Sequence, residues 1–108
     1  MGTPLSQHLQ SFNFDENTSG DHSIQAAVSG QKIRLRKFWL QAAGAVSIKF
    51  RSNTTDLHAE ITMAADQLLV FDNADDLPWY ETLVSEALQL NLSAAVRVRG
   101  TIYYTVGD

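Results

Sequence analysis

The 108-residue sequence contains no cysteine, which excludes a disulfide framework and any thiolate metal site. No stretch is apolar over the length that spans a membrane. The first 31 residues contain no lysine or arginine, and Met1 to Pro4 begin neither a basic region nor an apolar run. We therefore expect a soluble protein that is made without a cleaved signal peptide and has no membrane partner.

Basic residues are scarce throughout, with eight Lys and Arg against twelve Asp and Glu and a net charge of −4. This balance argues against nonspecific nucleic-acid binding, which depends on a basic surface that displaces counterions. The six glycines are scattered and form no phosphate-binding loop. Because no nucleophile stands in a recognisable pattern with a base, we predict neither an enzyme nor a cofactor.

Apolar residues make up 44% of the chain, enough for one domain with a real core. In the last quarter, from Ala87 to Val106, apolar and polar residues alternate. A period of two over this length is typical of strands that bury one face.

The same alternation, interrupted by turn residues, predicts earlier strands. These are residues 23–28, 32–42, 45–52, 57–63 and 68–71. The apolar parity breaks inside 32–42, which predicts a β-bulge near Arg36 and Lys37. Residues 78–85 fit one helical turn or an irregular segment. The whole indicates an all-β protein, an antiparallel β-sandwich of about eight strands over residues 21–108, preceded by an arm over residues 1–20.

The predicted arm is polar, with Leu5, Leu9, Phe12 and Phe14 as its sizeable apolar groups. An arm with a few apolar anchors can dock on a neighbouring subunit, so we consider these four residues candidates for partner binding. The alternative is a frayed terminus or a short edge strand.

Basic residues form pairs two positions apart, which places both charges on one face of a strand. The pairs are Arg34 with Arg36, Lys49 with Arg51, and Arg97 with Arg99. Neighbouring strands would join them into a basic stripe that could meet an acidic partner. The alternative is a solvated sheet face with cross-strand partners such as Glu60.

Two aromatic residues, Trp79 and Tyr80, follow Pro78. They could form an exposed interface anchor or a platform that stacks on a sugar. A pair that plugs the end of the sandwich would have the same sequence pattern.

The possible metal ligands are carboxylates and histidines. Asp72, Asp75 and Asp76 could bind calcium, but their spacing is not that of an EF-hand, and aspartate is an ordinary turn residue. His8, His22 and His58 are far apart, and we interpret them as surface histidines.

Several short segments of the sequence resemble those of a group of small β proteins encoded by tailed bacteriophages, usually among the virion genes. They are VSGQKIRL (28–35), AAGAVSIKF (42–50), WYET (79–82) and EALQLNLSAAV (86–96). The resemblance implies a jelly-roll-like virion structural protein, with a capsid decoration or cement role as the first expectation.

In that role the protein would bind the major capsid protein as a homotrimer on the virion surface, after synthesis in the host cytoplasm. A tail or baseplate component, or a carbohydrate-binding module, is the alternative. A cupin-type enzyme would need clustered histidines, which the sequence does not offer.

Overall fold

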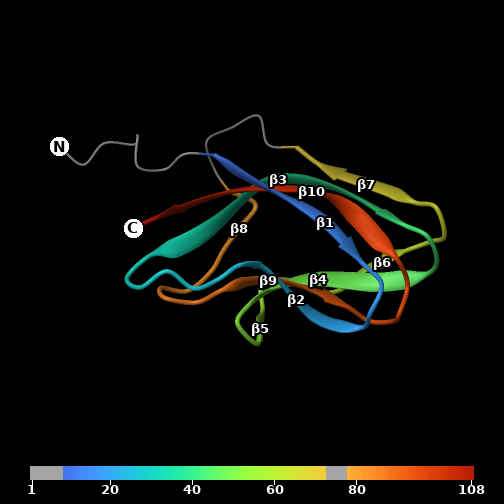
Figure 1. The fold of residues 1–108 in the computed structure, drawn as a ribbon, viewed down its shortest axis with the longest axis horizontal. Helices are drawn as coiled ribbons and strands as arrows, with labels where there is room; N and C mark the ends of the chain where they lie inside the picture. The colour runs from blue at the N-terminus through green and yellow to red at the C-terminus, as the bar shows by residue number, and fades with distance from the viewer. Residues whose placement is uncertain (1–8, 73–77) are drawn as a thin grey trace.

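The computed structural model describes residues 9–72 and 78–108. Within them the chain folds into two antiparallel sheets that pack face to face (Figure 1). The expected all-β sandwich is confirmed.

Ten strands form in the described residues. They are β1 (Gln10–Glu16), β2 (Gly20–Gln25), β3 (Lys32–Ala42), β4 (Val46–Ser52), β5 (Thr55–Asp56), β6 (Ile61–Met63), β7 (Leu68–Phe71), β8 (Tyr80–Glu81), β9 (Leu88–Leu92) and β10 (Val98–Gly107). β5 and β8 have two residues each, so the remaining eight agree with the expected number.

The strand order is that of a jelly roll. One sheet, here called sheet A, runs β1-β10-β3-β7, with β8 also paired to β3. The other, sheet B, runs β2-β9-β4-β5, with β6 also paired to β4. Apart from β4 to β6, successive long strands change sheets, so each sheet contains strands from both halves of the chain.

The core lies between the sheets and is built by the alternating apolar residues. Inward side chains of β3, β4, β9 and β10, such as Leu40, Ile48, Leu90 and Ile102, are completely buried. The alternation predicted from the sequence therefore identifies the buried face of the four central strands correctly.

The predicted bulge is present in β3. Tyr103 pairs with Lys37 but Tyr104 pairs with Leu35, so Arg36 is the extra residue. The insertion lets Leu35 and Phe38, three positions apart, both face the core.

The arm prediction needs correction over residues 10–20. Gln10–Glu16 pair along β10 as an edge strand of sheet A, the alternative noted above, and β2 begins at Gly20 rather than at Ser23. Residues 1–8 lie outside the described part of the chain.

Two further segments differ from expectation. The strand expected over 57–63 is reduced to β6, and the segment 78–85, expected as a helical turn or an irregular segment, contains the short strand β8, which pairs with β3. Thr82, which is buried, continues the β8 pairing: its Oγ1 accepts a hydrogen bond from Ile33 N (2.9 Å), and its N donates to Ile33 O (2.9 Å).

Candidate protein-binding surface

The outer face of sheet A is divided into a polar and an apolar half. Strand register places Asn13 opposite Thr101 on the β1 side, and Trp39 opposite Val70 on the β7 side. The next row continues with Leu68 opposite Gln41. The apolar side chains of this half therefore come from β7 and from Trp39 of β3.

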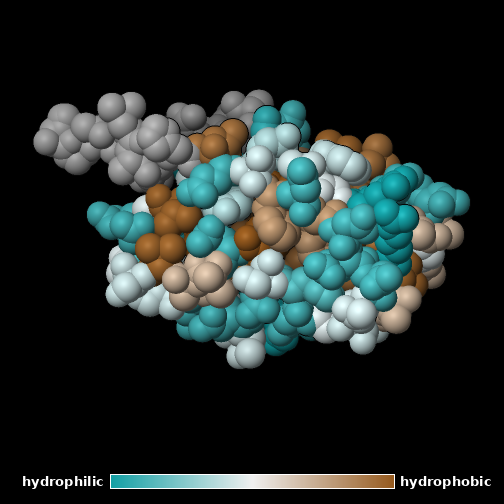
Figure 2. All heavy atoms as spheres, viewed as in Figure 1, coloured by the Kyte–Doolittle hydropathy of each residue, from teal (hydrophilic) through white to brown (hydrophobic). Residues whose placement is uncertain are grey.

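Three large side chains of this half are exposed to solvent. Trp39 is 38% exposed, Leu68 56% and Val70 59%. In Figure 2, brown atoms lie along the upper right rim, over the position that β7 has in Figure 1. We call these three residues the β7 patch.

A shallow pocket of about 190 Å³ adjoins the β7 patch. Its wall includes Trp39, Val70, Tyr103 and Asp72. The Lys37 ammonium group lies 5.0 Å from the centre of the Tyr103 ring, a cation–π distance. The pocket is thus apolar, with one charge of each sign at its rim.

The outer face of sheet B has a different character, since charged side chains there pair with one another. Arg51 contacts Asp21 (3.0 Å) and Asp56 (2.9 Å), and Lys49 also contacts Asp56 (3.1 Å). Lys49 hydrogen bonding holds the pKa of Asp56 below its usual value of 3.8. The charged side chains named on this face are therefore already paired within the protein.

The four predicted arm anchors do not act together. Phe14 is 2% exposed and belongs to the core, which corrects its assignment to partner binding, and Phe12 is half-buried against the core. Leu9 is 55% exposed, and Leu5 lies outside the described residues.

The basic pairs do not form one stripe, because they lie on different faces or at different ends of a sheet. Arg34 is next to Glu81 (3.1 Å), and Arg36 donates to Thr105 Oγ1 (3.1 Å). Arg97 makes two hydrogen bonds to Asp15 (3.0 and 2.9 Å), which hold the pKa of that carboxyl below its usual value of 3.8. The alternative of cross-strand partners describes these residues better.

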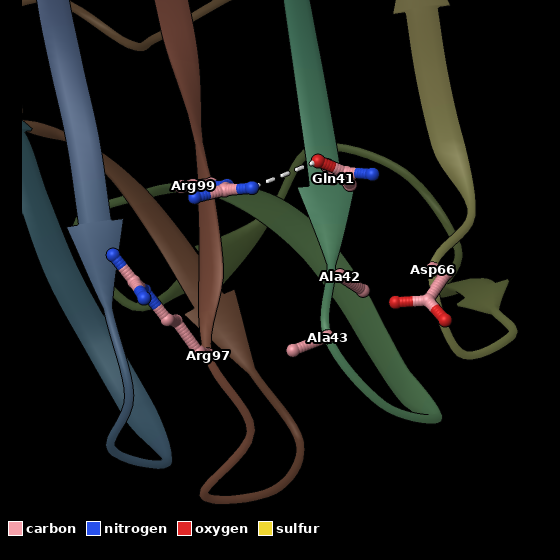
Figure 3. A pocket seen from close by; sticks show the side chains of 6 residues that line it. All are labelled: Gln41, Ala42, Ala43, Asp66, Arg97 and Arg99. Carbon is pink, nitrogen blue, oxygen red and sulfur yellow. Dashed lines mark hydrogen bonds between the residues drawn. The ribbon is translucent and has the colours of Figure 1, made fainter.

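Arg97 and Arg99 also line a small pocket at the end of sheet A (Figure 3). It has a volume of about 130 Å³ and includes Asp66 and Gln41. The Arg99 guanidinium lies 3.4 Å from Gln41 Oε1. Two arginines and one aspartate line this pocket, and Arg97 is already paired with Asp15.

Trp79 and Tyr80 close the side of the sandwich between β7 and β5. The Trp79 ring packs on Phe71 with a centroid distance of 4.8 Å, and Tyr80 stacks on His58 at 4.5 Å. Trp79 still exposes 41% of its surface. It therefore combines the plug and the exposed aromatic that the sequence left open.

His58 is half-buried, not an ordinary surface residue. Its Nε2 accepts a hydrogen bond from Phe50 N (2.9 Å), and its Nδ1 lies 2.6 Å from Ala59 O. Because a backbone amide can only donate, Nε2 must be unprotonated and Nδ1 carries the hydrogen.

The possible metal ligands are not brought together. Asp72 follows β7, while Asp75, Asp76 and His8 lie outside the described residues. In the parts of the chain that the structure describes, no group of three His, Asp or Glu is placed to hold a metal ion. The same parts contain no helix long and apolar enough to cross a membrane.

The sequence interpretation missed the β7 patch entirely. One signal was available: Trp39 falls on the opposite parity to Phe38 and Leu40, which face the core. A large aromatic residue on the outward parity of a central strand, next to other exposed apolar residues, marks a candidate interaction surface.

No protein-family model matches the chain, and no curated protein matches it.

Proposed function

We propose that this protein is a bacteriophage virion protein that decorates the capsid and binds the major capsid protein through the β7 patch. The observation that carries the proposal is the exposure of Trp39, Leu68 and Val70 on one face of a sandwich whose other outer face is ion-paired. Exposed apolar patches of this kind mark protein interfaces.

Two observations support a virion role. The sequence resembles small virion proteins of tailed phages over 28–35, 42–50, 79–82 and 86–96. The jelly-roll strand order agrees with the fold which that resemblance implies.

The mechanism needs no chemistry. Each copy contributes a modest contact, and a homotrimer would present three patches at once, so that several weak contacts add to one strong attachment. The protein would be made in the host cytoplasm and would reside on the capsid surface. Light scattering tests the trimer directly: we expect three times the monomer mass.

The binding claim is tested by cosedimentation with capsids that lack the protein. The test variant is Leu68→Ser/Val70→Ser. The matched control is Leu83→Ser/Val84→Ser, because these residues are similarly exposed (58% and 52%) and lie near Gln31, at the other end of β3. We expect the test variant to bind at least about tenfold more weakly and the control to bind like the wild type. Equal binding by both would refute the assignment of the β7 patch.

A carbohydrate-binding role, on a tail or baseplate, is the second candidate. The observation that favours it is the 41% exposure of Trp79, whose ring could stack on a sugar. In that case Trp79→Ala would abolish binding on a glycan array and leave the fold intact, whereas Leu68→Ser/Val70→Ser would leave glycan binding unchanged.

A further inference from the structure

Strand β7 is an outer strand of sheet A. Among the described residues it pairs only with β3, from Gln41 opposite Leu68 to Phe38 opposite Phe71. Its far side therefore carries backbone groups that no described strand satisfies.

The direction of these groups follows from one hydrogen bond. The backbone carbonyl oxygen of Gln67 accepts a hydrogen bond from Ala42 N (3.2 Å), so this carbonyl group points toward β3. Backbone direction alternates along an antiparallel strand. The N–H and C=O groups of Leu68 and Val70 therefore point away from β3, to the open edge.

Within its four residues, β7 lacks two of the features that protect edge strands from pairing, charged side chains and proline. Residues 67–71 read QLLVF and contain no charge, proline or glycine. By contrast, β1, the opposite edge of the same sheet, includes Asn13, Asp15 and Glu16. The β7 edge is suited to receive another strand.

Charge indicates which strand fits. Asp66 and Asp72, both exposed, lie beyond the two ends of the apolar segment, and residues 64–72 include no lysine or arginine. Antiparallel pairing of two β7 strands, with Leu68 opposite Val70, would place Asp66 opposite Asp72 of the second copy. Since like charges disfavour that pairing, a different segment with basic ends is the better match.

We propose that the β7 edge binds an extended segment of a partner protein as an added strand of sheet A. The segment has two apolar residues in alternation, next to Leu68 and Val70, and Lys or Arg at both ends. This inference rests on the proposed binding surface and adds its mode of recognition, β-augmentation. It does not depend on which virion protein supplies the segment.

A synthetic peptide, Lys-Thr-Val-Thr-Val-Thr-Lys, provides the probe, with binding followed by amide NMR shifts of the full-length protein. We expect the amide resonances of Leu68 and Val70 to shift, and those of Asp21 and Ser23 on the β2 edge to stay. Replacing both lysines by glutamate should weaken binding at least about fivefold.

The backbone contribution is tested by Val70→Pro, which removes the outward N–H but no bond to β3. Its control, Val70→Thr, keeps the N–H and the branched shape. We expect Val70→Pro to abolish the peptide-induced shift at Leu68 and Val70→Thr to retain it. The proposal is overturned if the peptide causes no shift at millimolar concentration, or if Val70→Pro binds it like the wild type.

Capsid cosedimentation separates this inference from the proposed function. Peptide binding without capsid binding would remove the capsid role and keep the strand-addition site. Capsid binding that Val70→Pro leaves unchanged would keep the capsid role and show that the capsid does not supply the added strand.

Discussion

Gly100 of β10 pairs with Leu40 of β3 on one side and with Phe14 of β1 on the other. A Cβ atom built at this position would lie 1.9 Å from Trp39 O and 2.9 Å from a Leu40 methyl carbon. The first of these contacts is with backbone, which cannot rotate away. The absence of a side chain is therefore a condition for pairing the two central strands of sheet A.

We expect Gly100→Ala to lower the free energy of unfolding by about 3 kcal/mol, the upper range for overpacking a core. Gly44→Ala is the control, because its Cβ would meet only the two methyl groups of Val96, at 3.3 and 3.6 Å. Urea denaturation measures both. Equal stability of the two variants would show that the strands can move apart at Gly100.

The Asp15–Arg97 pair gives a prediction about pH. Hydrogen bonding from Arg97 is the main cause of the lowered pKa of Asp15. The stability that this pair contributes is thus present above pH 3.8 and is lost as the pH falls through the lower, folded-state pKa.

Arg97→Gln should raise the pKa of Asp15 toward 3.8, as measured by carboxyl NMR titration. The pKa of Asp56 should not change, because its lowering comes from Lys49 and Arg51. A pKa of Asp15 that is unaffected by the substitution would contradict the assigned cause.

At the level of elements, His58 takes the place of a strand. β4 pairs with β6 through Val46–Ile48 and with β5 through Arg51 and Ser52, and between them the Phe50 amide finds its partner in the His58 ring. The side chain bridges the gap between two short strands. This explains why the segment after β5 departs from regular pairing.

Removal of this acceptor should leave the Phe50 amide without a partner. We expect His58→Ala to cost about 1–3 kcal/mol of unfolding free energy. His58→Phe keeps a ring beside Tyr80 and Phe50 but also lacks the acceptor, so the two variants separate the hydrogen bond from the ring contacts. If His58→Phe has wild-type stability in urea, the hydrogen bond contributes nothing measurable.

The two sides of β7 should respond differently to proline. Leu69 directs its N–H toward β3, whereas Val70 directs its N–H to the open edge. Leu69→Pro should therefore unfold or strongly destabilise the protein, by about 3 kcal/mol or more, and Val70→Pro should cost much less. Circular dichroism melts of both variants measure this, and similar melting temperatures would contradict the assigned directions.

Prediction from the sequence succeeded where apolar alternation was long and failed where single side chains decided the pairing. β3, β4 and β7 were predicted almost to the residue, β9 lies within the alternating segment 87–106, and the bulge at Arg36 followed from the change in parity. The bounds of β6 and β8 were not predicted, because they depend on side-chain hydrogen bonds of His58 to β4 and of Thr82 to β3. No local pattern encodes such contacts.

The candidate site was less predictable than the fold. Trp79 was identified as an aromatic of interest, but the β7 patch combines Trp39 with two residues some 30 positions later along the chain. Their neighbourhood arises only from the register of β3 with β7. Sequence spacing alone could not bring them together.

At the scale of the whole molecule, the two outer faces differ in their surface chemistry. On the outer face of sheet B, charged side chains form ion pairs with one another. The β7 side of sheet A instead presents apolar side chains and an open strand edge. A molecule with one such side is suited to attach in a single orientation. The polar face would then point to solvent.

Electron cryomicroscopy of capsids incubated with the protein tests this account most directly, because the orientation of the sandwich can be read from the density. We predict that sheet A faces the shell, with Trp39, Leu68 and Val70 covered by capsid protein and an additional strand beside β7. Capsids without added density, or with sheet B against the shell and β7 exposed to solvent, would contradict the account.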